Sequence, residues 1–221
     1  LETGHRSPAF DDVMEAAEDA CRRLAGLGPE HAVLFLPGGA TMQFAMVPMN
    51  LLPPGGTADH LHTGIWTGKA MREAARFGRV HRAFDGGPDG FRRIPDPREC
   101  TGSPDAAYLH YCANNTVMGT QFPEPPAGDA PLVVDASSEI FSRDPRIDRH
   151  RLIYAGAQKN LGPAGVSLVL VDRDWLASAA VTPEVRDLPS MLDLRRHLEA
   201  GSRLNTPPTF GIQLMRRMFE W

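Results

Sequence analysis

The chain has 221 residues, of which 42% are hydrophobic and 23% are charged, which is ordinary usage for a globular protein with a sizeable core. Its formal net charge of −4 argues against nucleic acid or an anionic membrane as the main partner. No apolar run approaches the roughly 20 residues of a transmembrane helix, and the start, LETGHRSPAF, lacks the layout of a secretory signal.

The first half of the chain combines helical and buried-strand patterns. Apolar and small residues recur at helical spacing from Ser7 to Leu27, and glycines end that pattern. A short buried strand from Ala32 to Leu36 runs through a Pro-Gly-Gly turn into a second helical pattern. A polar turn then leads into a helix from about Trp66 to Phe77. The stretch from Asp85 to Pro104 is rich in Gly, Pro and Arg and indicates an irregular connection.

The second half supplies mostly strands. The stretches AAYLHYC, APLVV and LIYAG each predict a strand, and the strand from Val166 to Val171 is almost wholly apolar. Buried, non-alternating strands that are separated by helices and long crossings are typical of a sheet covered on both faces. We therefore predict an α/β fold with a mostly parallel sheet flanked by helices, whose ligands bind at the carboxyl ends of the strands.

Three cysteines, Cys21, Cys100 and Cys112, are odd in number and widely spaced. This pattern favours free thiols in a reducing compartment over a disulfide framework or a zinc site, so we expect a cytoplasmic protein without a metal. We also expect the chain to be part of a longer protein. Leu1 is not a methionine, and the final amphipathic pattern, FGIQLMRRMFEW, stops without a cap.

Candidate functional residues lie at the predicted strand ends, and each also has an ordinary reading. The turn Pro37–Thr41 offers backbone amides to a phosphate, although Gly-Gly turns are common. Asp135 ends an apolar strand, where it either caps the next helix or holds a proton on the ring nitrogen of a cofactor. Lys159 is either a solvated loop lysine or an amine that attacks a carbonyl carbon. Trp66 either packs in the core or offers a flat face to a flat ligand.

Taken one at a time, the ordinary reading is favoured for each of these residues, and also for His5 and Arg6, which either are solvated or clamp an anion. Taken together, the set has one chemical use. A phosphate cradle, an aromatic face, an acid for a ring nitrogen and a reactive lysine are the four partners that pyridoxal 5′-phosphate needs.

The chain resembles the phosphoserine aminotransferases, a family of class V, fold-type I pyridoxal-phosphate enzymes. The resemblance runs nearly end to end, and the motifs occur in the order of that family. The stretches that carry it are GHRS, GGATMQFAMVPMNLL, TADHLHTGIW, YLHYCANNTVMG, VDASSEIFSR, YAGAQKNLGPAG and LNTPPTF.

The resemblance implies two catalytic residues. Lys159 would bind the cofactor covalently, and Asp135 would pair with the nitrogen of its ring and would be buried for that reason. Trp66 would stack on the ring, and Thr116 would lie beside it as a polar contact.

The resemblance also implies a homodimer with shared active sites. Ala40, Thr41 and Gln158 would bind the cofactor phosphate, which Asn205 and Thr206 would reach from the neighbouring subunit. Residues 1–200 would form the cofactor-binding large domain, and residues 201–221 would form the inter-subunit contact and the start of a helix.

The implied reaction transfers the amino group of glutamate to 3-phosphooxypyruvate, which yields phosphoserine and 2-oxoglutarate. His5 and Arg6 match the family's substrate-anion segment. The chain departs from the family at Ala40 and Thr41, where a third glycine or an arginine is frequent. Members of the family also begin upstream of Leu1 and continue into a smaller domain that supplies a substrate arginine.

Two alternatives stay open. One keeps the fold and the cofactor but changes the substrate, as in alanine- or serine-glyoxylate aminotransferases or cysteine desulfurases. Desulfuration is disfavoured because Gln158 stands where desulfurases usually have a histidine and because Cys112 lies in a predicted strand. The other alternative is a truncated relative that folds and dimerises without catalysis.

Overall fold

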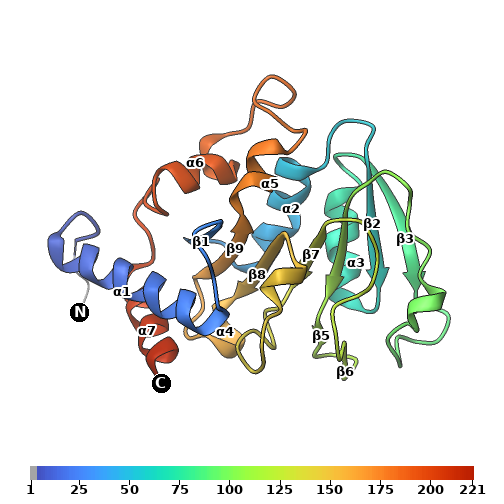
Figure 1. The fold of residues 1–221 in the computed structure, drawn as a ribbon, viewed down its shortest axis with the longest axis horizontal. Coiled ribbons are helices and arrows are strands. Elements are labelled where there is room, and N and C mark those ends of the chain that lie inside the picture. The colour runs from blue at the N-terminus through green and yellow to red at the C-terminus, as the bar shows by residue number, and fades with distance from the viewer. Residues whose placement is uncertain (1–3) are drawn as a thin grey trace.

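The computed structural model describes residues 4–221, which form a seven-stranded sheet with helices on both faces (Figure 1). The α-helices are α1 (Pro8–Ala25), α2 (Gly39–Leu51), α3 (Ile65–Ala74), α4 (Ala157–Asn160), α5 (Arg173–Ser178), α6 (Leu194–Glu199) and α7 (Thr209–Glu220). The strands of the sheet are β1 (His31–Leu36), β2 (Thr57–His62), β3 (Arg79–Asp85), β4 (Ala106–Cys112), β7 (Leu132–Asp135), β8 (Leu152–Gly156) and β9 (Ser167–Asp172). A small ladder joins β5 (Asn114–Asn115) to β6 (Thr120–Gln121).

The strand order is β1-β9-β8-β7-β4-β2-β3. Strands β8, β7, β4, β2 and β3 pair in parallel, whereas β9 is antiparallel to both of its neighbours, β1 and β8. The predicted mostly parallel α/β fold is therefore confirmed. Because β9 is the single reversed strand, the carboxyl ends of β1, β7 and β8 lie at the same edge of the sheet.

Each face of the sheet has its own apolar layer. On one face, α1 and α7 pack against each other, so the first and last helices of the chain lie side by side (Figure 1). The opposite layer contains apolar residues of α2, α3, α5 and α6, including Phe44, Ala70, Leu176 and Leu194. Strands such as β8 and β9 are buried on both faces, which explains their continuous apolar sequences.

The segment before α3 differs from the prediction made from the sequence. A polar turn is expected there, but the structure has the strand β2, and β3 follows α3 at the sheet edge. Asp59 of β2 is buried because the amide and the hydroxyl of Ser103 donate to its carboxylate at 2.6 and 2.7 Å. His60 is also buried, next to the rings of Tyr108 and His110, and burial lowers the pKa of His60 to about 4. The buried polar side chains of β2 thus contact residues far along the chain, Ser103 through hydrogen bonds and Tyr108 through its ring.

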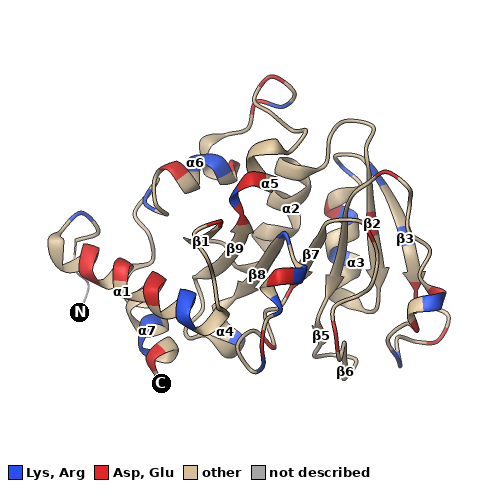
Figure 2. Cartoon of the chain, in the orientation of Figure 1, with Lys and Arg blue, Asp and Glu red and all other residues tan. Residues whose placement is uncertain are grey.

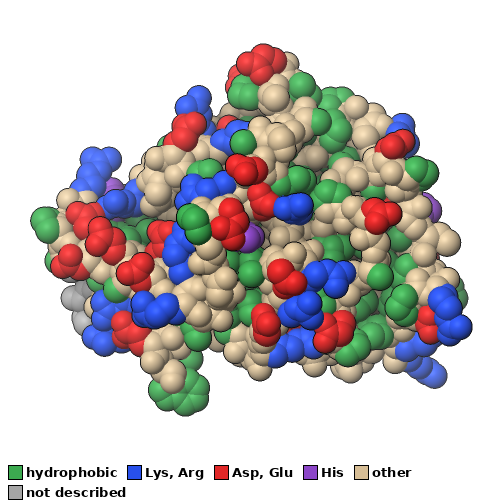
Figure 3. All heavy atoms as spheres, in the orientation of Figure 1, with side chains coloured by type: hydrophobic (Ala, Val, Ile, Leu, Met, Phe, Trp, Pro, Cys, Tyr) green, Lys and Arg blue, Asp and Glu red, His purple; other side chains and the backbone are tan. Residues whose placement is uncertain are grey.

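Charged residues gather on the outer helices and the connecting loops rather than in the central strands (Figure 2). On the face drawn in Figure 3, acidic and basic side chains are interspersed. Among residues 4–221, no helix combines the length and the apolar character needed to cross a bilayer. The three cysteines are free, as predicted.

Asn50 anchors the C-terminal half of α2 and is fully buried. Its amide nitrogen Nδ2 donates to the carbonyl oxygens of Met46 and Leu192, both at 2.8 Å, and its Oδ1 accepts from the amide of Leu194 at 2.9 Å. One side chain therefore joins α2 to the segment that leads into α6.

Replacing Asn50 by alanine should lower the free energy of unfolding by about 1–3 kcal/mol, because the buried amide of Leu194 and the carbonyl of Leu192 lose their partner. Urea unfolding followed by circular dichroism measures this change. Ser178→Ala removes an exposed hydroxyl and should change it by less than about 0.5 kcal/mol. Equal stability of Asn50→Ala and wild type would contradict the anchoring role.

Candidate active site

A cleft of about 330 Å³ opens at the edge of the sheet where β1, β7 and β8 end. This is the position at which α/β folds bind ligands. The cleft is lined by Gly38, Gly39, Ala40, Thr41, Phe44, Trp66, Asp135, Ser137, Gln158, Lys159, Ala164 and Gly165.

Lys159 lies one turn beyond the end of β8, in the short helix α4, and its side chain is exposed to the cleft. Its Nζ donates to Thr116 Oγ1 at 3.1 Å and lies 5.1 Å from the centre of the Trp66 ring. No ion pair within residues 4–221 includes this ammonium. The amine is therefore held by a hydroxyl and an indole, and no carboxylate competes with a ligand for it.

Asp135 is the last residue of β7, and only 5% of its surface is exposed, as expected from the sequence. The amide and the hydroxyl of Ser137 donate to Oδ1 at 3.0 and 2.6 Å. No hydrogen bond within residues 4–221 reaches Oδ2. Asp135 thus closes the turn that follows β7 with one oxygen and leaves the other for a ligand in the cleft.

Burial raises the pKa of Asp135 above its ordinary value, because charged carboxylates are poorly solvated inside a protein. The two bonds from Ser137 and the nearby charge of Lys159 oppose this rise. The same Ser137 hydroxyl accepts from the amide of Gly156 at 3.0 Å, which joins the end of β7 to the end of β8. Ser137 therefore links Asp135 to the strand that carries Lys159.

The N-terminus of α2 forms one wall of the cleft. Gly38 and Gly39 have φ angles of 96° and 65°, a region that favours glycine, and a Cβ atom on Gly38 would lie 2.6 Å from Cβ of Met42. No side chain caps the helix and no acidic residue lies in its first turn. The free amides and the helix dipole make this end suitable for an anion.

Trp66 and Thr116 are brought to the cleft by a shared polar network. Asn115 is buried, and its Nδ2 donates to the hydroxyls of Thr63 and Thr120 at 3.1 and 3.2 Å. Thr63 lies just before α3, whose second residue is Trp66, and Thr116 directly follows Asn115. Asn115 and Ser137 were not among the predicted site residues, since a polar residue beside a strand end gives no signal of what it binds.

Thr116 is not among the residues that line this cleft and contacts it through Lys159, and four further predicted residues do not line it either. Asn205 is half-buried between α6 and α7, and its buried Oδ1 makes no hydrogen bond within residues 4–221. Thr206 is exposed. His5 is half-buried and Arg6 is exposed, in the turn before α1. The roles of these four residues stay predictions.

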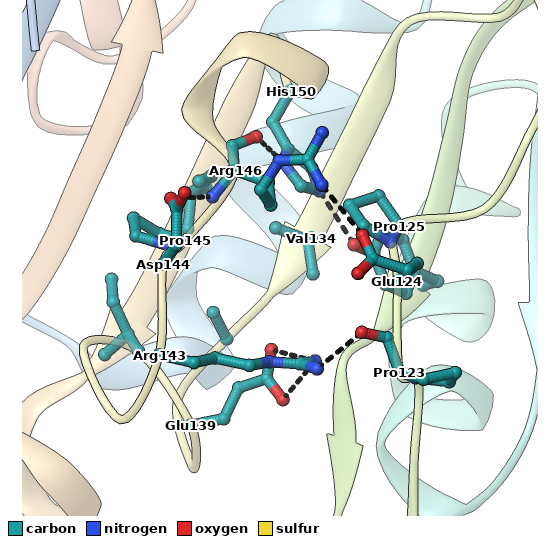
Figure 4. A pocket seen from close by; sticks show the side chains of 14 residues that line it. Pro123, Glu124, Pro125, Val134, Glu139, Arg143, Asp144, Pro145, Arg146 and His150 are labelled. Carbon is teal, nitrogen blue, oxygen red and sulfur yellow. Dashed lines mark hydrogen bonds and ion pairs between the residues drawn. The ribbon is translucent and has the colours of Figure 1, made fainter. Parts of the chain in front are cut away.

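A second cavity, of about 220 Å³, lies on the opposite face of the sheet (Figure 4). Val134 contributes to its floor and precedes Asp135, so the two side chains point to opposite faces. Its charged residues are engaged with one another. Arg146 pairs with Glu124 at 2.8 Å across the opening, and Arg143 pairs with Glu139, four residues before it, at 3.0 Å. No reactive group is left free there, so the first cleft is the candidate active site.

Comparison with known proteins identifies the family to which the chain is similar. Residues 2–221 match the aminotransferase class-V family. The chain is 46% identical over its whole length to the phosphoserine aminotransferase of Azotobacter vinelandii and covers 60% of that relative. The solved phosphoserine aminotransferase from Bacillus circulans subsp. alkalophilus matches 99% of the chain, with a TM-score of 0.93 and 39% identity, over 60% of its own length.

A third match is the PLP-bound phosphoserine aminotransferase from Trichomonas vaginalis, with a TM-score of 0.88 and 32% identity over the whole chain. The chain covers 61% of that protein. It thus spans about 60% of the length of the relatives it matches.

Because Asp135 is buried, its replacement by asparagine should stabilise the protein, whereas most substitutions in a protein core destabilise it. Since the pKa is raised in the folded state, that state binds the proton more tightly than the unfolded chain. The stability that protonated Asp135 contributes is present at low pH and is lost as the pH rises above the ordinary carboxyl value. Asp135→Asn should therefore raise the free energy of unfolding of the cofactor-free protein at about pH 7 and leave it nearly unchanged at about pH 4.

Urea unfolding at both pH values measures this difference, with Asp148→Asn, an exposed carboxylate, as the matched control. A loss of stability in Asp135→Asn at neutral pH would show that the ionised carboxylate stabilises the fold, contrary to the assigned pKa direction.

Proposed function

The chain belongs to the class-V aminotransferase family, and from that premise we propose that it transfers the amino group of glutamate to 3-phosphooxypyruvate, with pyridoxal 5′-phosphate as cofactor. The products are phosphoserine and 2-oxoglutarate. The observation that carries the proposal is that Lys159 and Asp135 line one cleft together with the N-terminus of α2. The names of the matching relatives support the choice of substrate.

The residues of the cleft fit pyridoxal 5′-phosphate. The uncapped first turn of α2, with Ala40 and Thr41, suits its phosphate, and Gln158 lines the same cleft. The unbonded Oδ2 of Asp135 suits a protonated ring nitrogen. Trp66 offers an aromatic face, and Lys159 offers an amine that no carboxylate of residues 4–221 engages.

When bound, pyridoxal 5′-phosphate supplies a ring that accepts the electron pair left on the substrate after the α-proton departs. Lys159 would hold the cofactor covalently, and its Nζ would take the α-proton of the substrate as general base and return it as general acid. Thr116 Oγ1, 3.1 Å from Nζ, orients the amine. Buried Asp135 would hold a proton on the ring nitrogen, because the low dielectric around it would strengthen their attraction.

Cysteine chemistry finds no support in the cleft. Cys112 is the last residue of β4, is 3% exposed and does not line the cleft. Burial raises the pKa of its thiol well above the ordinary value, so the nucleophilic thiolate is suppressed. This favours amino transfer over sulfur transfer.

The functional unit that we propose is a homodimer with shared sites. Asn205 and Thr206 do not line the cleft of their own chain, and the buried Oδ1 of Asn205 has no partner within residues 4–221. The first observation supports a role at the cofactor phosphate of the other subunit, to which Nδ2 of Asn205 and the hydroxyl of Thr206 would donate. The second leaves Oδ1 able to accept a hydrogen bond from that subunit. We further propose that His5 and Arg6 bind the anionic group of the substrate, since imidazole and guanidinium suit a carboxylate or phosphate.

Residues 1–200 serve in this proposal as the cofactor-binding domain, and residues 201–221 as the inter-subunit contact and the start of a helix toward a further domain. A cytoplasmic location belongs to the same proposal. The three free cysteines support it, because thiols persist in a reducing compartment.

The direct test is an assay with glutamate as donor. The purified protein should form phosphoserine and 2-oxoglutarate in equal amounts, and Lys159→Ala should lose the visible absorbance of the lysine-linked cofactor and about 10²–10⁴-fold in kcat. Glyoxylate serves as the competing acceptor. Faster turnover of glyoxylate than of 3-phosphooxypyruvate would overturn the substrate assignment, and full absorbance and turnover of Lys159→Ala would overturn the role of the lysine.

Mixed dimers test the shared site. When a Lys159→Ala subunit pairs with an Asn205→Ala subunit, the cleft that keeps its lysine receives an intact Asn205, so cofactor affinity should equal that of wild type. When the double variant pairs with wild type, the cleft with a lysine receives alanine instead, and affinity should fall about tenfold, as for a lost bond to a charged phosphate.

Differently tagged subunits allow each mixed dimer to be purified and titrated with pyridoxal 5′-phosphate. The proposal fails if the weakened affinity follows the subunit that carries Asn205→Ala rather than its partner.

A further inference from the structure

The indole of Trp66 faces two ammonium groups. Nζ of Lys69 lies 4.6 Å from the centre of the ring, and Nζ of Lys159 lies 5.1 Å from it. Distances below about 6 Å give an attraction between a cation and the negative face of an aromatic ring. Lys159 belongs to the cleft already described, whereas Lys69 does not line it.

Lys69 reaches Trp66 because of helix geometry. The two residues are three positions apart in α3, and side chains of a helix lean toward its N-terminus, so Lys69 lies over the turn that holds Trp66. Lys69 is half-buried, and its ammonium makes no hydrogen bond or ion pair within residues 4–221. The indole is the one partner that the described chain gives it.

The carboxylate that could compete with the indole for Lys69 already has another partner. Glu73 lies four positions after Lys69, at the spacing where a helix commonly forms an ion pair. Its carboxylate instead pairs with Arg76 Nε at 3.1 Å. Lys69 therefore stays with the ring rather than with a carboxylate on its own helix.

We propose that Lys69 is a positioning residue, whose ammonium fixes the orientation of the Trp66 ring so that the ring is ready to stack on the cofactor. The inference rests on the proposed function, because it takes Trp66 as the stacking face. Once Lys159 is occupied by the cofactor, Lys69 is the ammonium that still faces the indole. A ring held before binding need not be immobilised by the ligand, which strengthens binding.

Two substitutions separate charge from packing. Lys69→Met keeps a long apolar side chain and removes the charge, so the affinity for pyridoxal 5′-phosphate should fall about three- to tenfold. Lys69→Arg keeps a cation that also stacks on indole and should stay within about twofold of wild type. Arg72→Met removes one positive charge from the exposed side of the same helix and should leave the affinity unchanged within about twofold.

A second measurement needs no cofactor. The near-ultraviolet circular dichroism of the cofactor-free protein reports how firmly its tryptophan rings are held, and the difference between wild type and Trp66→Phe isolates the part due to Trp66. Lys69→Met should lose most of that part, and Lys69→Arg should keep it. Lys69→Gln repeats the test if the methionine variant does not fold.

The outcomes are separable. Lys69 has no positioning role if Lys69→Met keeps both the dichroism of Trp66 and the cofactor affinity. A charge contact is also excluded if Lys69→Arg is as impaired as Lys69→Met, or if Arg72→Met weakens binding equally. Failure of the wild type to bind pyridoxal 5′-phosphate would instead overturn the proposed function, and the cofactor-free dichroism would still decide the role of Lys69.

Discussion

The candidate site depends on one hydroxyl group, that of Ser137. It donates to Oδ1 of Asp135 at 2.6 Å and accepts from the amide of Gly156 at 3.0 Å. It therefore stabilises a buried carboxylate at the end of β7 and ties it to the end of β8, three residues before Lys159. Because Oδ1 takes both bonds from Ser137, Oδ2 is left toward the cleft. The arrangement separates the structural oxygen of Asp135 from the oxygen available to a ligand.

The cleft holds groups that the folded chain alone leaves incompletely satisfied. Asp135 is a carboxylate with a raised pKa, α2 begins without a side-chain cap, and Lys159 has no carboxylate partner within residues 4–221. Each of them costs stability in the free protein or forgoes an available gain. A ligand with an anionic group, a protonated nitrogen and an electrophilic carbon satisfies all three together, which is why we infer a cofactor rather than a simple substrate pocket.

The sequence predicts those residues of the site whose position depends only on the strand that they follow. Apolar runs followed by Asp135 or Lys159 place both residues at the carboxyl edge, and the structure confirms that placement. What the sequence does not predict depends on which of several possible partners a polar side chain contacts. The strand β2 is hidden because its polar Asp59 is satisfied by Ser103, and the contact of Lys69 with Trp66 depends on Glu73 having paired with Arg76. Such choices between partners are made only when the chain has folded.

The central claim is that buried Asp135 keeps a proton on the ring nitrogen of the cofactor. Nitrogen-15 NMR of the protein loaded with pyridoxal 5′-phosphate labelled at that nitrogen measures this proton directly. We expect the chemical shift of a protonated pyridine nitrogen to persist well above the pH at which the free cofactor loses its proton, and to be lost in Asp135→Asn. An unprotonated shift in the wild-type protein at neutral pH would contradict the account.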